Sequence, residues 1–144
     1  MKAHFRTLLA ATAALFAQLA HADFYLVVQS ANPQPSLTQK EAVDLFMGRN
    51  RAFRNGDLAQ VYDLPRDSAA RADFYQRLTG MGPAQVNSYW ARLMFSGQTM
   101  PPQSVVDETA MLDTVKHTTG AIGWVRKEPA DKQLRVLLGI KESS

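Results

Sequence analysis

The chain has 144 residues, of which 46% are hydrophobic and none is cysteine, with 16 Lys and Arg against 13 Asp and Glu. This length suits one domain that buries a core without disulfides, and the missing thiols exclude cysteine catalysis and most structural zinc sites. Because the charges are nearly balanced and no long run of Lys or Arg occurs, the composition argues against a nucleic-acid partner.

Residues 1–22 are expected to form a secretory signal peptide. Lys2 and Arg6 give a basic start, and positions 7–20 form an apolar run with only one strongly polar member. The small residues at the end of this segment suit signal peptidase, so we expect cleavage after Ala22. A membrane anchor is the alternative, but a spanning helix needs about 20 apolar residues, and this run is shorter.

Residues 23–144 are therefore expected to form one domain in the periplasm. This part of the chain is nearly neutral, because Lys2 and Arg6 account for most of the positive excess. Its single histidine, His117, has no catalytic motif around it, so we expect a solvated or core-edge side chain. The sequence predicts no enzyme, no metal site and no cofactor.

The first half of this domain predicts two strands, each followed by a helix. Phe24–Gln29 is a short aromatic and β-branched run, which is typical of a buried strand. Thr38 and Glu41 fit a capping box, which predicts a helix over 38–47. The next elements are a strand over 58–64 and a helix that begins at Asp67 or Ser68 and stops at Gly80.

The second half predicts two helices and two strands. Apolar side chains recur every three or four residues over 83–95, which indicates an amphipathic helix. They belong to Val86, Tyr89, Trp90, Leu93 and Met94. Asp107 is expected to cap a fourth helix, and Ala121–Val125 and Leu134–Leu138 predict the last strands.

Strands that alternate with helices predict an α/β fold, a three-layer αβα sandwich whose mainly parallel sheet has helices on both faces. In such sheets ligands bind beyond the carboxyl ends of strands. Two loops fit this description, residues 30–36 and 64–71. In the first loop, Ser30 and Asn32 are candidate ligand groups.

The second loop combines several groups that suit an anion. The N-terminus of a helix presents free backbone N–H groups and a partial positive charge. Ser68 adds a hydroxyl and Arg66 and Arg71 add guanidinium groups, with Asp67 and Ala69 beside them. We therefore predict an anion site at these five residues. The alternative is that Ser68 only caps the helix while both arginines are solvated.

Three segments resemble, in order and spacing, blocks of the phosphate-type family of periplasmic substrate-binding proteins. They are SLTQKEAVDLFMG at 36–48, SYWARLMFSG at 88–97 and TGAIGWV at 119–125. Members of that family usually clamp the ligand between two α/β lobes. The resemblance implies that residues 23–144 form a single lobe of the type 2 periplasmic binding protein fold.

The family's ligand loop has the form R-x-[D/E]-x-S-G-T-R, in which the first Arg, the Ser and the Thr hold the oxyanion. Ser68 and Arg71 match this pattern, whereas Leu64, Ala69 and Ala70 replace its Arg, Gly and Thr. The lost arginine alone removes charge-assisted hydrogen bonds of roughly 1.5 to 3 kcal/mol. The resemblance therefore implies weak binding.

Two functions follow as hypotheses. The first is an exported binding module that recognises phosphate or a similar oxyanion weakly, as an accessory to phosphate ABC transport or sensing. The second is a domain that has lost the ligand site and docks a periplasmic or inner-membrane protein, or a second copy of itself as a homodimer. An exposed apolar patch near residues 30–35 and Pro101–Pro102 would favour the second. An enzyme is not expected, because no general base accompanies Ser68.

Overall fold

A computed structural model describes residues 22–142, so the predicted signal peptide lies outside the described residues. Its elements are β1 (Phe24–Gln29), α1 (Gln39–Phe46), β2 (Gln60–Asp63), α2 (Ala69–Thr79), α3 (Pro83–Phe95), β3 (Gln103–Ser104), α4 (Glu108–Lys116), β4 (Ala121–Val125) and β5 (Leu134–Ile140). No helix in this part of the chain is long and apolar enough to cross a bilayer.

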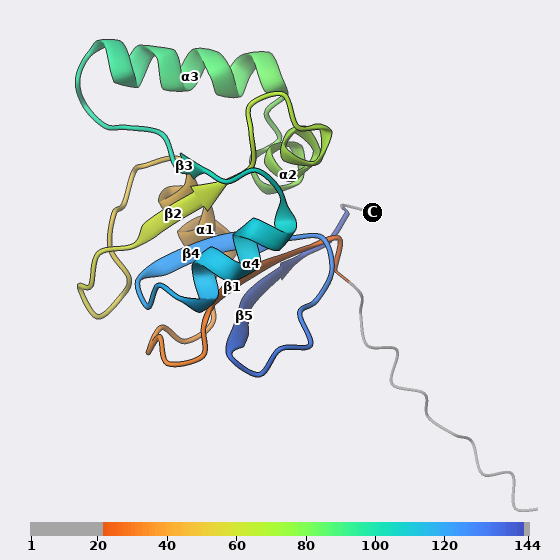
Figure 1. Cartoon of the computed structure of the whole chain (residues 1–144). Helices are drawn as coiled ribbons and strands as arrows, with labels where there is room; N and C mark the ends of the chain where they lie inside the picture. The colour runs from red at the N-terminus through yellow and green to blue at the C-terminus, as the bar shows by residue number, and fades with distance from the viewer. Residues whose placement is uncertain (1–21, 143–144) are drawn as a thin grey trace, which may run out of the picture.

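The five strands form one mixed sheet in the order β3-β2-β4-β1-β5 (Figure 1). β2 pairs in parallel with β3 and β4, whereas β1 pairs antiparallel with both β4 and β5. Four strands therefore run in one direction and β1 runs against them. The predicted α/β fold is confirmed, but the sheet is mixed, because two of its four strand pairings, both made by β1, are antiparallel. The reversed direction of β1 determines which loops lie at each edge of the sheet.

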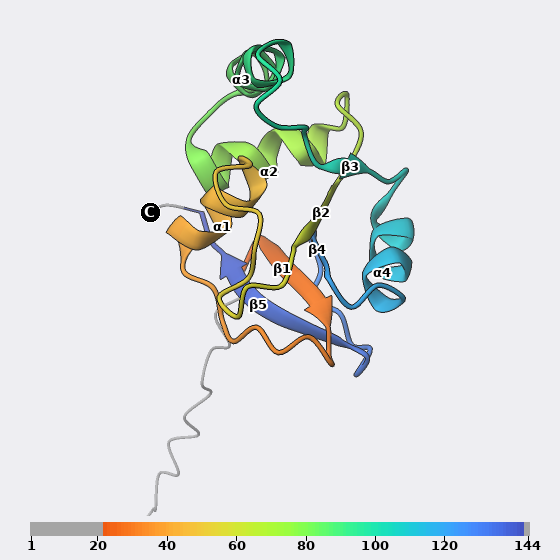
Figure 2. The same cartoon turned by 90° about the vertical axis from the view of Figure 1, so that its left-hand side faces the viewer.

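Helices cover both faces of the sheet, as predicted. α4 lies on one face, against β4, while α1 and α2 lie on the other (Figure 2). The approach of α4 depends on Gly123, since an added Cβ there would lie 2.4 Å from the sulfur of Met111. α3 does not cover the sheet: it lies beyond α2 and contacts that helix.

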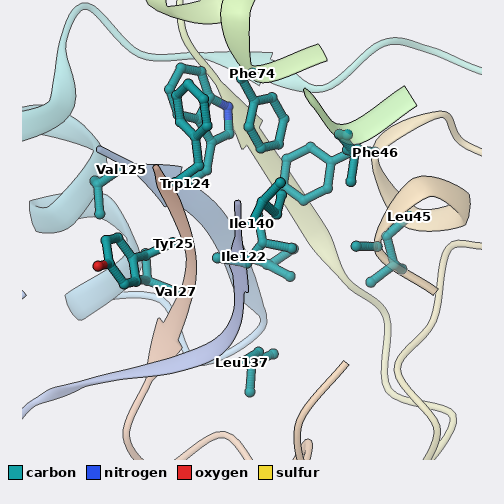
Figure 3. Packing of buried hydrophobic residues seen from close by; sticks show 14 of the residues in the cluster. Tyr25, Val27, Leu45, Phe46, Phe74, Ile122, Trp124, Val125, Leu137 and Ile140 are labelled. Atoms are coloured by element: carbon teal, nitrogen blue, oxygen red, sulfur yellow. The ribbon is translucent and has the colours of Figure 1, made fainter. Parts of the chain in front are cut away.

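Aromatic side chains fill the layer between α2 and the sheet (Figure 3). The rings of Phe74 on α2 and Trp124 on β4 stack in parallel, with centroids 4.4 Å apart and an interplanar angle of 6°. Phe24 meets both rings edge-on, at 5.6 and 5.5 Å, and Phe46 of α1 meets Phe74 at 5.2 Å. This cluster fixes α2 on the sheet and so sets the position of its N-terminus.

The helix boundaries follow from the predicted caps. Thr38 and Glu41 form the expected capping box, and Ser68 and Asp107 accept hydrogen bonds from the first turns of α2 and α4. α2 stops at Gly80, whose φ of 76° is a left-handed conformation that glycine adopts without strain. Local side-chain chemistry therefore sets these ends.

Three sequence expectations need correction. The second strand covers only 60–63, because Leu58 instead forms an isolated bridge with Ala52 and is 74% exposed. The two-residue strand β3 was not predicted, since it is too short for a pattern. The apolar stripe of α3 is only partly buried: Met94 is 49% exposed, because α3 packs on α2 and on the C-terminal end of α1 and does not cover the sheet.

Candidate functional site

A buried carboxylate lies where β2 ends. Asp63, the last residue of β2, is 2% exposed. Its Oδ1 accepts hydrogen bonds from the backbone N–H of Leu64 at 2.8 Å and from Nε1 of Trp124 at 3.1 Å. Its Oδ2 accepts from Nε of Arg71 at 2.9 Å and from the hydroxyl of Tyr75 at 2.8 Å. Four donors, one of which is the cation Arg71, therefore compensate a carboxylate that would otherwise be costly to bury.

The buried environment of Asp63 also shifts the pKa of Tyr75. Burial raises the pKa of the Tyr75 phenol well above its ordinary value, and the nearby negative charge and hydrogen bond of Asp63 raise it further, against a smaller opposing effect of Arg71. The phenol thus stays protonated and continues to donate to the carboxylate at any ordinary pH. The junction of β2 and α2 is a fixed polar network inside the core.

Arg71 is held in place by this network and also borders the surface. Its guanidinium carbon lies 4.9 Å from the centre of the Tyr75 ring, in a cation–π contact. The side chain is buried, yet it lines a surface groove, and the ion pair with Asp63 uses Nε.

The N-terminus of α2 lies beside Arg71. The hydroxyl of Ser68 accepts from the backbone N–H of Arg71 at 3.2 Å, so Ser68 is the cap. The N–H groups of Ala69 and Ala70 have no acceptor among residues 22–142, as expected for a first helical turn. Arg66 is exposed and lines the same groove as Arg71. Asp67 and Ala69 are exposed on the helix start.

The groove is an open depression of about 560 Å³ between α3, the end of β2 and the segment before β3. It is lined by Asp63, Leu64, Arg66, Arg71, Asn87, Trp90, Ala91, Met94, Phe95, Pro101, Pro102 and Ser104. Its formal charges are the two guanidinium groups and the one paired carboxylate. A smaller depression of about 290 Å³ adjoins it and shares Trp90, Pro101 and Pro102.

The structure does not bring the two predicted loops together. Ser30 and Asn32 follow β1, which runs antiparallel to β4, so they lie at the edge of the sheet where β4 begins. Asn32 is buried and its side-chain nitrogen donates to the carbonyl of Thr119 at 2.9 Å. Its role is to join two loops at the edge opposite to Ser68. The two candidate loops therefore lie at opposite edges of the sheet, because β1 runs antiparallel to β4 whereas β2 runs parallel to it.

Sequence reasoning also missed residues that the structure brings to the site. From the sequence, no role in the site was assigned to Asp63, which directly precedes the candidate loop, or to Tyr75 and Trp124. A polar residue that ends a buried strand was the available signal for Asp63. Nothing local could have paired it with Trp124, which is 61 residues away in sequence.

His117 lies away from this site. It caps the C-terminus of α4, its side chain is 68% exposed, and Nδ1 lies 2.8 Å from the carbonyl oxygen of Asp113. The expected solvated histidine is confirmed. No group of three His, Asp or Glu side chains suited to a metal ion is found within residues 22–142.

Two solved structures resemble this fold. An ABC-type phosphate transport receptor from Vibrio cholerae aligns with a TM-score of 0.62 and 18% identity, over 81% of this chain and 45% of the receptor. A protein described as a phosphate ABC transporter substrate-binding protein, from Clostridium perfringens and solved with bound phosphate, aligns with a TM-score of 0.64 and 15% identity, over 81% of this chain and 44% of that protein. The fold is that of one lobe of these proteins.

The similarity concerns the fold, since the identities are low, and the chain spans less than half the length of either protein. No protein-family model and no curated protein matches the sequence. Both neighbours are described by binding and transport, so the expected class of fold, a lobe of a binding protein, agrees with the structure.

Proposed function

We propose that this protein is an exported binding module that holds phosphate or a similar oxyanion weakly at the N-terminus of α2, as an accessory to phosphate transport or sensing. The observation that supports this most directly is the position of Arg66 and Arg71 on one groove. Beside them lie the unpaired N–H groups of Ala69 and Ala70. A helix N-terminus with two guanidinium groups is a favourable place for an anion.

The geometry also explains why binding should be weak. Arg71 already shares its charge with Asp63, so the groove offers an incoming anion only the remaining guanidinium edge of Arg71 and the exposed Arg66. Leu64, buried at the position of the family's first arginine, adds no donor. The groove is open to solvent, so its charges are partly screened by water and salt.

Calorimetric titration of the purified protein with inorganic phosphate tests the proposal. We expect weak but saturable binding, and a thermal stabilisation that corresponds to about 2.7 kcal/mol at one hundred times the Kd. Arg66→Gln should weaken this binding. Arg92→Gln is the matched control, because Arg92 is also exposed but lies on α3 outside the groove. Absence of any heat or thermal shift at millimolar phosphate would contradict the proposal.

A second function is favoured by a separate observation. Large hydrophobic side chains are exposed along residues 94–106: Phe95 is 97%, Val106 78%, Met100 70% and Met94 49% exposed. Met94 and Phe95 line the groove together with Pro101 and Pro102, and Met100 lines the adjoining depression with the same prolines, whereas residues 30–35 lie at the other edge of the sheet. Contiguous exposed apolar surface often marks a protein contact.

We therefore propose, as the alternative, that the patch docks a periplasmic protein or a second copy of the chain. The molar mass in solution, measured by size exclusion with light scattering, tests the second-copy form. A dimer that Phe95→Ser converts to a monomer would support it. A monomer at all concentrations would exclude self-association.

A further inference from the structure

We propose that the anion bound at α2 is an organic phosphate, a phosphate monoester whose apolar group lies in the groove beside α3. This inference rests on the proposed anion site and names the chemical class of its ligand. It follows from the size of the groove, from the chemistry of its walls and from where its charges lie.

The groove is larger than an inorganic oxyanion requires. Its volume of about 560 Å³ lies within the range of roughly 300 to 1,000 Å³ that is typical of sites for organic ligands. A single tetrahedral ion at the start of α2 would leave most of this space to water. A ligand with an organic body would fill it and remove more apolar surface from solvent.

The walls of the groove divide by chemistry. The guanidinium groups of Arg66 and Arg71 come from the β2–α2 junction. The apolar side chains come mainly from elsewhere, with Trp90 and Met94 on α3 and Pro101 in the segment before β3. A ligand that contacts both parts must have an anionic group and an apolar group in one molecule.

The apolar side of the groove, on α3, is exposed to solvent. Met94 is 49% exposed although it lies on the groove, and exposed apolar surface of this kind is stabilised when a ligand covers it. Asn87 and Ser104 are the uncharged polar groups on the same lining. They can orient a ligand by hydrogen bonds, as the few polar groups of mainly apolar sites do.

The positive charge of the groove favours an anionic group on the ligand. The lining carries two guanidinium groups against one carboxylate, and that carboxylate already accepts four hydrogen bonds. A cationic ligand would find no free acceptor with a charge. A phosphate monoester keeps at least one negative charge at neutral pH and presents several acceptor oxygens to the guanidinium groups of Arg66 and Arg71.

The test compares three compounds by calorimetry on the purified protein: phenyl phosphate, inorganic phosphate and phenol. We expect phenyl phosphate to bind at least about tenfold more tightly than inorganic phosphate, and phenol to bind far more weakly than phenyl phosphate.

Two matched variants locate the apolar group. Met94→Ser should remove the advantage of phenyl phosphate and leave the affinity for inorganic phosphate unchanged. Met100→Ser is the control, because Met100 is also exposed but lines the neighbouring depression. Thermal unfolding of both variants without ligand should match that of the unchanged protein, since neither side chain is buried in the core.

The outcomes separate this inference from the function on which it rests. Equal affinities for phenyl phosphate and inorganic phosphate would overturn the inference and leave the anion site in place. Phenol that binds as tightly as phenyl phosphate would also overturn it, because the groove would then act without the anion. No binding of either phosphate compound would overturn the proposed anion site itself.

Discussion

Asp63 and Arg71 form a buried ion pair, with Nε of Arg71 2.9 Å from Oδ2 of Asp63, at the junction where β2 passes into α2. The side chains are 3% and 10% exposed. The pair does two things at once, because it compensates the charge of Asp63 and restrains the arginine that borders the groove. Its removal should therefore change stability and anion binding in opposite directions.

Asp63→Asn should destabilise the fold and strengthen anion binding. Removal of one partner of a buried pair costs about 3 to 5 kcal/mol, and asparagine, which can still accept hydrogen bonds, should fall near the lower end. Arg71 would then offer its full charge to an anion. Denaturant unfolding and phosphate titration measure the two effects. Asp73→Asn is the control: it breaks the exposed pair with Arg126 and should cost about 0 to 1 kcal/mol. Weaker phosphate binding in Asp63→Asn would contradict this account.

Tyr75 should resist ionisation in the folded protein. Its pKa is raised well above the usual value of 10.0, first by burial and then by Asp63. A pKa raised in the folded state means that stability is fully present below about pH 10 and is lost as the pH rises further. The ultraviolet absorbance of tyrosinate and the midpoint of unfolding should therefore change together in strong base. In Tyr75→Phe the alkaline loss of stability should be smaller, and an unchanged loss would show that Tyr75 is not responsible.

Glu41 should make the stability of the fold depend on pH in acid. The hydrogen bonds from Arg54, followed by the one from the backbone of Thr38, lower the pKa of Glu41 from 4.5 to about 2. Because this pKa is depressed in the folded state, the stability that it contributes is present above pH 4.5 and is lost as the pH falls toward 2. NMR titration of the Glu41 carboxyl group measures the pKa. Arg54→Gln should move it back toward the usual value, and no movement would exclude Arg54 as the main cause.

Ser68 should contribute to both the helix and the anion site. Its hydroxyl caps α2, and replacement of such a cap by alanine costs about 0.5 to 2 kcal/mol, whereas glycine costs only a few tenths. We expect Ser68→Ala to lower the free energy of unfolding by about 1 kcal/mol. Both Ser68→Ala and Ser68→Gly should weaken phosphate binding, and the glycine variant separates this effect from stability. Unchanged affinity in both would remove Ser68 from the site.

Phe74→Ala should be the most destabilising of these changes. Phe74 is fully buried and stacks on Trp124 at 4.4 Å, and truncation of a buried phenylalanine costs about 3 to 5 kcal/mol. Phe95→Ala is the control on a side chain that is 97% exposed, and it should change stability little. Denaturant unfolding measures both, and similar losses in the two variants would contradict the core described for α2.

The sequence predicted those parts of the fold that depend on neighbouring residues. The cap at Ser68 and the stop at Gly80 are short-range hydrogen-bond and backbone effects, so the helix between them was foreseen. The direction of β1 depends on its partners, since Tyr25 pairs with Val125 at the far end of the chain. No local pattern encodes that pairing, so the sequence did not predict that Ser30 and Asn32 lie at the edge of the sheet opposite to Ser68.

The candidate site divides in the same way. Ser68, Arg66 and Arg71 were found because they are close in sequence and carry anion-binding groups. The partner of Arg71 is eight residues earlier, on a different element, and the groove wall on α3 arises from a helix that packs on α2 rather than on the sheet. Those relations exist only in three dimensions, so the sequence predicted the charged end of the site and not its apolar wall.

Trp124 belongs to the core and to the site at once, because its ring stacks on Phe74 while its Nε1 donates to Asp63. The two halves of the groove should therefore tolerate evolutionary change very differently. Variation at the charged end disturbs the interior and is limited by the marginal stability of any small domain. Asn87, Ala91 and Met94 on α3 are not part of the core. Substitutions at these positions can therefore change the ligand specificity of the groove without disturbing the folding of the lobe.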